Sequence, residues 1–485
     1  MSCRAQLTIG VDVGTQSVKA VVYDVDSRAV VARGSSDPLD VATDGVPGRA
    51  EQRPEDWMVA LKQAVGRACE GVDAAQVGAF GVSGQQHGLV VLGADKAVLR
   101  PAKLWCDVEA AKEAEELSRE FGWPLLASFT APKLLWLKHA EPETYASVRH
   151  VLLPHDWVNF RLTGELAMEC GDASGTGLLD INTRSWNQAW LDVIDPRLSS
   201  WLPAVSDGGD APIGKLRPDM AEYLGLPTGI AVSKGSGDNM CSALGVGAVE
   251  EGRWVCSLGT SGTVFGFSNA LDIDQTGAVA PFCDCTGGYL PLLCTLNCTG
   301  PVNEICSLTG KSHEELAQEA LAAPVGKLLM LPYFVGERTP NWPGSTGALL
   351  GITPGSLTPG GLYRAAIEGA TLSLLSGLGR LKEASRSDIT ELIAVGGGAR
   401  SDLWCQTLAD AFGVPVVAPA EPEAAAFGAA LQAAAALLGA ETRSYVREVT
   451  SAAEGGRRFV PDAAKKALYE DALQRFEKSG AKLFA

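Results

Sequence analysis

The chain has 485 residues, which exceeds the roughly 250–300 at which a single hydrophobic core usually stops growing, so we expect at least two domains. Its 46% hydrophobic and 20% charged residues are typical of a globular protein and argue against a disordered or fibrous chain. The formal net charge of −17 argues against a nucleic-acid partner, because binding to a phosphate backbone requires clustered Lys and Arg. A nucleotide can still bind if backbone N–H groups and a metal ion hold its phosphates.

Neither a signal peptide nor a membrane span is predicted. The first residues lead directly into a strand-like segment without the apolar core of a signal peptide, so we expect a cytoplasmic protein. The most apolar stretch, residues 424–440, consists chiefly of Ala and is shorter than the roughly 20 residues needed to cross a bilayer. We therefore predict a buried helix there and no membrane association.

The chain opens with a predicted antiparallel β-meander. Three apolar runs, residues 7–11, 18–23 and 29–32, are joined by short polar turns. A helix is predicted to begin at Pro54, and a strand is expected at residues 77–82. The first part of the chain is therefore expected to combine a sheet with helices that cover it.

A second predicted strand pair, residues 254–258 and 263–267, resembles the first pair of the meander. Its turn aligns with the first turn when Gly14 is placed over Gly259, an offset of 245 residues (259 − 14). This offset is about half the chain and too long for a solenoid repeat. We therefore predict one internal repeat in two lobes.

The boundary between the lobes is predicted in a Gly-rich segment that precedes the second strand pair. The first lobe is expected to comprise residues 1–234 and the second residues 235–450. Residues 451–485 are predicted to be a C-terminal helical segment, which the sequence assigns to neither lobe.

The two repeated turns carry the first candidate chemistry. Asp12 ends a buried strand directly before a turn whose glycine lets backbone N–H groups approach an anion. The second turn has Ser257 in the place of this carboxylate. The asymmetry fits two phosphate-binding turns that face each other across a cleft, with Asp12 as a ligand of Mg²⁺. The candidate nucleotide-binding residues of the turns are Gly14, Thr15, Gln16, Gly259, Thr260 and Ser261. Two ordinary hairpins are the alternative interpretation.

A glycine loop, residues 396–398, lies between a predicted strand and a predicted helix. This order is typical of nucleotide binding, with Ser401 placed as the helix cap and Asp402 in the first turn. The spacing matches neither the Walker loop nor the dinucleotide fingerprint, so neither a P-loop enzyme nor a Rossmann dehydrogenase is indicated.

Asp238 is the candidate general base. It lies at a predicted corner between a strand, residues 229–232, and a helix of small residues. In phosphoryl transfer to an alcohol the enzyme mainly positions the groups, and a carboxylate within about 3 Å of the hydroxyl takes its proton. Capping of the helix by Asp238 is the alternative interpretation.

A polar loop, residues 84–88, separates the strand at 77–82 from a further predicted strand at 89–92. Its Gln86 and His87 can form hydrogen bonds with sugar hydroxyls, and such buried polar pairs discriminate strongly between polyols. A structural role for the histidine is the alternative. Trp105, in another polar loop, is a further candidate for substrate binding, with packing as its alternative role.

In these motifs the sequence resembles the FGGY carbohydrate kinases and, within that family, the bacterial xylulokinases. The resemblance covers nearly the whole chain and depends on many short segments in the same order. They are residues 12–15, 84–88, 104–107, 129–136, 152–154, 172–176, 237–239, 257–262, 337–340 and 396–401.

The resemblance implies an α/β fold of two actin-like (ribonuclease-H-like) domains, each with a mixed sheet, and a cleft between them. It implies an ATP-dependent sugar kinase that transfers the γ-phosphate to O5 of D-xylulose, with Mg²⁺ as the metal. Asp238 then corresponds to the catalytic base and Asp12 to the metal-associated aspartate. The implied sugar-binding residues are Gln86, His87, Asp238 and Asn239, and the implied adenine-nucleotide residues are Gly398, Ala399 and Asp402.

Two departures from the family pattern concern the sugar pocket. Some xylulokinases carry Met at the place of Gln86, and Cys106 replaces a common Asn. A kinase for another ketopentose or a polyol, such as ribulose or ribitol, therefore remains an alternative. A non-catalytic actin-like module that binds a nucleotide is the alternative from a different class. A homodimer is possible, since dimers are the commonest assembly of soluble enzymes.

Overall fold

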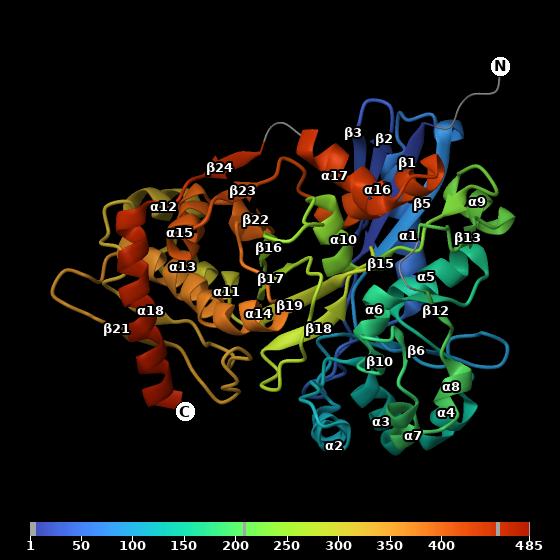
Figure 1. Ribbon diagram of the computed structural model, residues 1–485, viewed down its shortest axis with the longest axis horizontal. Helices are drawn as coiled ribbons and strands as arrows, with labels where there is room; N and C mark the ends of the chain where they lie inside the picture. Colours follow the sequence, from blue (N-terminus) through green and yellow to red (C-terminus); the bar gives the residue numbers. More distant parts are fainter. Residues whose placement is uncertain (1–5, 207–209, 453–455, 485) are drawn as a thin grey trace. The chain divides into compact units, whose positions relative to one another are not determined.

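The computed structural model describes residues 6–206, 210–452 and 456–484 of the chain (Figure 1). The chain forms two compact units. Unit 1 comprises Met1–Val249, Phe282–Leu290 and Glu423–Ala452, and unit 2 comprises Glu250–Pro281, Pro291–Pro422 and Ala453–Ala485. The chain thus leaves unit 1 at Glu250 rather than at residue 235, and the Ala-rich segment expected in the second lobe returns to unit 1.

Unit 1 is built on a mixed sheet with the strand order β13-β14-β5-β1-β2-β3, in which β15 also pairs with β5. The strands β1 and β15 run parallel to β5, and β2 is antiparallel to β1. The bounds are β1 (Leu7–Val13), β2 (Val18–Asp24), β3 (Ala29–Ser35), β5 (Val77–Gly84), β13 (Gly214–Lys215), β14 (Ala231–Val232) and β15 (Ser236–Gly237). The predicted meander and the strand after the first helix are confirmed.

Helices cover both faces of this sheet. Successive side chains of a strand point to opposite faces, so neighbouring residues of β1 contact different helices. Ile9 of β1 belongs to the buried core that contains Trp57 of α1 (Pro54–Ala68). Gly10 points to the other face, where α16 (Ala424–Leu438) packs so closely that a Cβ at Gly10 would lie 2.0 Å from the carbonyl oxygen of Ala426. The Ala-rich helix is therefore buried by contact with β1 and β5 (Figure 1).

The remaining elements of unit 1 are short. The helices are η1 (Ala74–Gln76), α2 (Ala111–Phe121), α3 (Thr130–Ala140), α4 (Pro142–Ser147), α5 (Pro154–Thr163), α6 (Cys170–Ser174), α7 (Gln188–Ile194), α8 (Leu198–Trp201), α9 (Pro218–Leu224), α10 (Asp238–Gly245) and α17 (Thr442–Ala452). The strands are β4 (Glu51–Gln52), β6 (Val90–Leu92), β7 (Ala102–Lys103), β8 (His150–Leu152), β9 (Met168–Glu169), β10 (Leu179–Asp180), β11 (Ser185–Trp186) and β12 (Val205–Ser206).

Unit 2 repeats the sheet arrangement of unit 1. Its strand order is β18-β19-β17-β16-β22-β23-β24, with β17 antiparallel and β22 parallel to β16. The bounds are β16 (Arg253–Leu258), β17 (Gly262–Gly266), β18 (Val279–Cys283), β19 (Tyr289–Thr295), β22 (Glu391–Val395), β23 (Val416–Ala418) and β24 (Arg457–Phe459), with β20 (Leu329–Leu331) and β21 (Ala348–Leu350) in a separate pair. The predicted internal repeat is confirmed by this shared topology.

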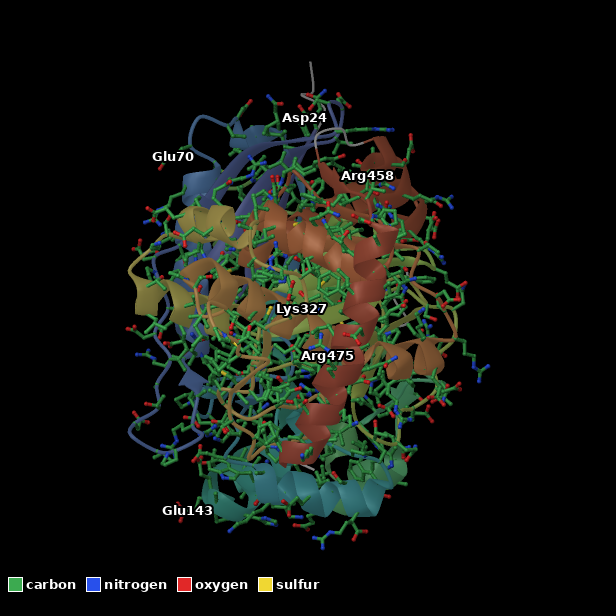
Figure 2. The ribbon with its side chains drawn as sticks, turned by 90° about the vertical axis from the view of Figure 1, so that its left-hand side faces the viewer. Asp24, Glu70, Glu143, Lys327, Arg458 and Arg475 are labelled. Atoms are coloured by element: carbon green, nitrogen blue, oxygen red, sulfur yellow. The ribbon has the colours of Figure 1, made fainter. Side chains whose placement is uncertain are left out.

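The helices of unit 2 include the C-terminal segment. They are α11 (Thr299–Thr309), α12 (His313–Ala320), α13 (Pro359–Ser376), α14 (Leu378–Ser385), η2 (Gly397–Arg400), α15 (Asp402–Phe412) and α18 (Ala463–Phe484). On α18, Arg475 donates a hydrogen bond to the carbonyl of Gly326 (Figure 2). Tyr469 donates to Glu368 Oε1 at 3.0 Å. These contacts fix α18 on unit 2.

Among the described residues, no single helix has the length and apolar character needed to cross a membrane, and only a pair bent by 120°, Ala424–Leu438 with Thr442–Ser451, reaches that length.

Candidate active site

In unit 1 the carboxyl ends of three parallel strands meet at one edge of the sheet. Gly84 of β5 lies in register with Val13 of β1 on one side and with Gly237 of β15 on the other. The segments that follow these three residues therefore leave the sheet side by side. Ligands of open α/β sheets bind at this edge, and the Asp12 turn, the 84–88 loop and Asp238 all lie there.

Asp12 is the last side chain but one of β1. Its Oδ1 accepts a hydrogen bond from Ser83 Oγ at 2.9 Å. Burial raises the pKa of this carboxyl above its ordinary value, and the Ser83 hydroxyl partly offsets that effect. Because burial disfavours the ionised form of Asp12, a nearby cation would stabilise this carboxylate more than an exposed one.

The turn after Asp12 is held by side chains. Thr15 donates from Oγ1 to Gln85 Oε1 at 3.0 Å and accepts at the same oxygen from Trp105 Nε1 at 3.0 Å. Gln52 Nε2 donates to the carbonyl of Thr15 at 2.7 Å. Gln16, by contrast, is exposed. These bonds join the turn to the polar loop and explain why Trp105, although 40% exposed, has a fixed place.

Asp238 is the first residue of α10, and Gly237 occupies the cap position. The capping interpretation of Asp238 is therefore wrong. Its Oδ1 instead accepts from the backbone N–H and the side-chain amide of Asn239, at 2.8 and 3.0 Å. Burial, with the nearby carboxyls of Asp12 and Asp172, raises the pKa of Asp238 to about 8. A raised carboxyl pKa at the end of a strand is typical of a general base.

Gln86 is buried and bonded to the residue after the candidate base. Its Oε1 accepts from Asn239 Nδ2 at 2.7 Å. Because the same Nδ2 also donates to Asp238, the carboxylate fixes the orientation of the Asn239 amide and, through it, that of Gln86. Three of the residues that the sequence singled out thus form one hydrogen-bonded group.

His87 has its backbone in the left-handed region, with φ of 65°. Its Nδ1 donates to the carbonyl of Gly175 at 2.7 Å, so in the neutral ring Nε2 is an acceptor. The ring packs against Phe129 and Phe282, with centroid separations of 4.8 and 5.5 Å, and these two phenyl rings also contact each other at 6.0 Å. The imidazole is therefore held in one orientation, as a specific contact to a sugar hydroxyl requires.

The unusual backbone of His87 is supported from α3. Its carbonyl accepts from Thr130 Oγ1 at 3.1 Å and from Lys133 Nζ at 3.2 Å. Lys133 is fully buried, and this burial lowers the pKa of its ammonium to about 7. Neither residue was singled out individually from the sequence, because a Lys in an apolar helix gives no sign of its partner.

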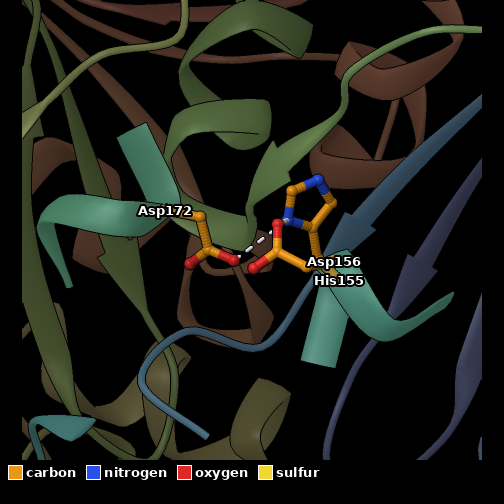
Figure 3. A group of neighbouring side chains, drawn as sticks. All are labelled: His155, Asp156 and Asp172. Atoms are coloured by element: carbon orange, nitrogen blue, oxygen red, sulfur yellow. Dashed lines mark hydrogen bonds and ion pairs between the residues drawn. The ribbon is translucent and has the colours of Figure 1, made fainter. Parts of the chain in front are cut away.

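The sequence analysis gave no role to a buried charged cluster next to β15, although Asp172 lies in one of the segments that carry the resemblance (Figure 3). His155 Nδ1 lies 3.0 Å from Asp172 Oδ2 and 3.2 Å from Asp156 Oδ1, and all three side chains are fully buried. His155 Nε2 lies 2.7 Å from the carbonyl of Lys234. Glu169 Oε1 accepts from Ser236 Oγ at 2.6 Å. The cluster thus forms hydrogen bonds with Lys234 and Ser236, in the segment that precedes Asp238.

The spacing of this cluster would also suit a metal ion, since one oxygen or nitrogen of His155, Asp156 and Asp172 lies within 4.8 Å of each of the others. The imidazole does not fit that role. Its two nitrogens face the Asp172 carboxylate and a backbone carbonyl, which are both acceptors, so both nitrogens carry a proton. Burial opposes this charge, but the neighbouring carboxyls, Asp156 foremost, outweigh it and raise the pKa of His155 to about 10.

In unit 2 the second turn and the glycine loop lie against each other. Ser257 of β16 is paired with Val395 of β22, so the turn at Gly259 and the loop at Gly396 follow neighbouring parallel strands. A Cβ at Gly398 would lie 2.7 Å from the Leu258 Cβ. The loop is therefore in direct contact with the residue that precedes the turn.

The unit 2 turn is held by backbone hydrogen bonds. The N–H groups of Cys298 and Thr299, at the start of α11, donate to the carbonyls of Thr260 and Gly259 at 3.1 and 3.0 Å. Thr260 itself is exposed, and Ser261 is partly exposed. The turn can therefore present its surface to a ligand without breaking an internal contact of the Thr260 side chain.

The helix after the glycine loop begins as predicted. Ser401 caps α15 by accepting from Trp404 N, and Asp402 is its first residue. Asp402 forms an ion pair with Arg457, whose guanidinium also donates to the carbonyls of Ala399 and Arg400. Arg457 thereby holds the segment between the glycine loop and α15. It escaped the sequence analysis because it lies 55 positions further along the chain.

The segment at Glu337, for which the sequence suggested no role, is a buried loop anchor of unit 2. Glu337 Oε1 accepts from the backbone N–H of Leu296 at 2.7 Å, and Oε2 accepts from Asn297 Nδ2 at 3.1 Å. These bonds hold the loop that follows β19 and precedes α11.

Comparison with known proteins places these features in one family. Residues 7–245 match the N-terminal domain of the FGGY family of carbohydrate kinases, and residues 254–437 match its C-terminal domain. A xylulose kinase from Streptomyces coelicolor is 40% identical over 461 residues, which cover 92% of this chain and 91% of that protein.

Solved structures agree. A xyloylose kinase from Brucella ovis superposes with a TM-score of 0.90 at 31% identity, covering 98% of this chain and 99% of that one. A gluconate kinase from Lactobacillus acidophilus superposes with a TM-score of 0.89 at 26% identity, covering 98% of both chains. The expected fold of two actin-like α/β domains is confirmed, and the chain belongs to the FGGY family of carbohydrate kinases.

Proposed function

We propose that this kinase transfers the γ-phosphate of ATP to O5 of D-xylulose, with Asp238 as the general base. The observation that carries the proposal is the position of Asp238 at the carboxyl ends of β1, β5 and β15, within one hydrogen-bonded group with Asn239 and Gln86. A carboxyl whose pKa is raised to about 8 accepts a proton readily when the sugar hydroxyl attacks. The 40% identity to a xylulose kinase supports the choice of sugar.

The sugar is expected to lie against Gln86, His87, Asn239 and Trp105. The hydrogen bond from Nδ1 of His87 to the carbonyl of Gly175 fixes the orientation of the ring that we expect to contact the sugar. The indole of Trp105 is 40% exposed and is joined through its N–H to Thr15. This combination of fixed polar groups and an aromatic face suits a small polyol.

The nucleotide is expected to use both turns and the glycine loop. Backbone N–H groups at Gly14, Thr15 and Gln16, and at Gly259, Thr260 and Ser261, would bind phosphate oxygens. Gly398 and Ala399 would contact the adenosine, with Asp402 at the helix start. A neutral, side-chain-free glycine loop fits this task because backbone can approach the nucleotide closely.

Mg²⁺ is the metal we expect with ATP, and Asp12 is the residue that would hold it. The donor set fits, because Mg²⁺ retains several waters and is commonly bound by one or two carboxylates together with phosphates. Bound Mg²⁺ would neutralise charge on the phosphates. Asp12 would hold the metal from the end of β1, while the Ser83 hydroxyl donates to Oδ1 of Asp12 and fixes the orientation of the carboxylate.

A coupled assay of ADP release over a panel of pentuloses and polyols tests the proposal. We expect D-xylulose to give the highest kcat/KM, with a phosphorylated product whose NMR spectrum places the phosphate on O5. The similarity to a gluconate kinase shows why the panel must be broad, and it should include ribulose, ribitol and gluconate. Highest activity with another sugar would contradict the substrate. Nucleotide binding without any sugar-stimulated ADP release would contradict a kinase function.

A further inference from the structure

Two buried polar atoms beside the proposed sugar site lack a hydrogen-bond partner among the residues that the structure describes. They are Nε2 of Gln86, which is a donor, and Oδ1 of Asp172, which is an acceptor. The two side chains are only 4% and 0% exposed. An unpaired buried donor or acceptor destabilises the folded chain, so a matching donor and acceptor in one place call for an explanation.

Both atoms belong to side chains that pack against the same backbone position. A Cβ at Gly237 would lie 2.5 Å from Gln86 Cγ and 3.1 Å from Asp172 Oδ1. Gly237 immediately precedes Asp238. The absence of a side chain at this position is what lets Gln86 and Asp172 approach each other beside the catalytic segment.

The contacts of Asp238 and Asn239 determine that Nε2, and not Oε1, is the unpaired end of the Gln86 amide. The Asp238 carboxylate accepts from Asn239 Nδ2, so this amide group must present its N–H₂. Asn239 Nδ2 then donates to Gln86, so the atom that faces it is Oε1. The remaining end of the Gln86 amide is therefore the N–H₂ group.

The contacts of His155 determine that Oδ1 is the unpaired oxygen of Asp172. The carbonyl of Lys234 accepts from His155 Nε2, and His155 Nδ1 donates to Asp172 Oδ2. Figure 3 shows the other carboxylate oxygen of Asp172 pointing away from the imidazole ring. Burial raises the pKa of Asp172, whereas the hydrogen bond and the charge of His155 lower it, so the imidazolium favours the ionised carboxylate, in which Oδ1 is an acceptor.

We propose that Asp172 is a positioning residue for sugar binding, which accepts a hydrogen bond from Gln86 Nε2 and completes a polar chain from His155 through Gln86 and Asn239 to Asp238. No hydrogen bond joins Gln86 to Asp172 in this structure, so the bond requires a movement of the Gln86 amide. The chain would fix which end of the Gln86 amide meets the sugar. The inference rests on the proposed sugar kinase function.

The first test is a double-mutant cycle of Asp172→Asn and Gln86→Ala, with the sugar KM, the ATP KM and kcat as readouts. With Asn at 172, its carbonyl faces His155 and its N–H₂ faces the N–H₂ of Gln86, so the amide of Gln86 is displaced. We expect Asp172→Asn to raise the sugar KM about tenfold and to leave the ATP KM within a few-fold. In the Gln86→Ala background the same change should have almost no further effect.

A role of Asp172 in stability alone predicts a different result. Asp172→Asn would then change the sugar KM by the same factor in both backgrounds, and that outcome would overturn the inference. Thermal unfolding of each variant separates lost positioning from lost folding. A wild-type protein that releases no ADP with any sugar would overturn the proposed function as well, whereas an active wild type with equal factors would overturn only the role of Asp172.

A second comparison keeps the inference testable if Asp172→Asn does not fold. Gln86→Glu brings a second carboxylate opposite Asp172, whereas Gln86→Met has similar size and no charge. We expect Gln86→Glu to raise the sugar KM several-fold more than Gln86→Met. Where Asp172→Asn does fold, adding it to Gln86→Glu should restore part of the loss, because the new amide donates to the new carboxylate. Equal effects of Glu and Met at position 86 would overturn the inference.

Discussion

The loops after β5 and β22 occupy equivalent places in the two repeated sheets, but their surroundings differ. The unit 1 loop carries Gln85, Gln86 and His87, and each of these side chains is held by a polar or aromatic neighbour. The unit 2 loop consists of Gly396, Gly397 and Gly398, with Gly396 at a φ of 85° that favours glycine. The same sheet topology thus presents polar side chains at this place in unit 1 and glycine backbone in unit 2.

The two turns show the same contrast. In unit 1 the Thr15 hydroxyl is bonded to Gln85 and Trp105, and the carboxylate of Asp12 is bonded to Ser83. In unit 2 the turn at Gly259 is held through its backbone. A sugar is distinguished by fixed side-chain donors and acceptors, whereas phosphates need only backbone N–H groups. Under the proposed function, we therefore expect the sugar specificity to depend on the side chains of unit 1, and the glycine loop of unit 2 to contact the nucleotide through its backbone.

The largest effect is expected from Asp238→Asn, which removes the base and keeps the size of the side chain. Loss of general-base catalysis typically costs about 10²–10⁴-fold in rate, so kcat should fall by that factor. Asp219→Asn is a matched control, because this carboxylate of unit 1 is exposed and forms its ion pair with the neighbouring, exposed Arg217. A turnover number within a few-fold of wild type in folded Asp238→Asn protein would show that the chemistry resides elsewhere.

The pH dependence of kcat/KM for the sugar should follow the titration of Asp238. The base acts without its proton, so activity should fall by about tenfold for each pH unit below the pKa of this group. That pKa is about 8 without metal or nucleotide, and a bound cation would lower it towards the ordinary 3.8. We expect the acidic midpoint between these values. Constant activity down to about pH 4, as for an ordinary carboxyl, would contradict a raised pKa.

Asp12→Ala should mainly raise the concentration of Mg²⁺ and ATP needed for activity, by about tenfold or more, because the metal loses its carboxylate. The equivalent change in unit 2, Ser257→Ala, should have a much smaller effect, since Ser257 offers no charge. Titrations of Mg²⁺ at fixed ATP would measure both variants. Equal metal requirements in the two variants would contradict the asymmetry of the turns.

Gly398→Ala tests the bare loop of unit 2 and should have the smallest effect on turnover. Its Cβ would lie 2.7 Å from Leu258 Cβ and 3.0 Å from Trp404, so we expect a destabilisation of about 1–3 kcal/mol and a several-fold higher KM for ATP. The adjacent Gly397→Ala is the control, because a Cβ there meets no atom within 4 Å. Thermal unfolding and ATP titration would separate the two variants. Identical behaviour would show that the close packing has no role.

The sequence predicted the elements that local patterns determine. Alternating apolar runs and turn residues located the meander, and the repeated Gly-Thr turns revealed the two equivalent sheets before their strand order was known. Position along the chain did not reveal which unit a helix joins. The Ala-rich helix α16 lies after the second sheet in sequence, yet its small residues let it pack on β1 and β5.

The candidate site was predictable where one short segment holds the functional groups, as at Asp238-Asn239 and Gln86-His87. It was not predictable where contacts join distant segments. His155, Asp172 and Arg457 act through partners in other segments of the chain. His155 and Asp172 are buried, whereas Arg457 is exposed and only its contacts with Ala399, Arg400 and Asp402 reveal its role. Charged residues within apolar segments are the signal that could have identified His155 and Lys133.

A crystal structure with D-xylulose and a non-hydrolysable ATP analogue would test the central claim most directly. The account predicts a sugar hydroxyl within about 3 Å of the Asp238 carboxylate, in line with the terminal phosphate, and further sugar hydroxyls on Gln86 and His87. A sugar bound away from the ends of β1, β5 and β15, with the Asp238 side chain turned from it, would contradict the account.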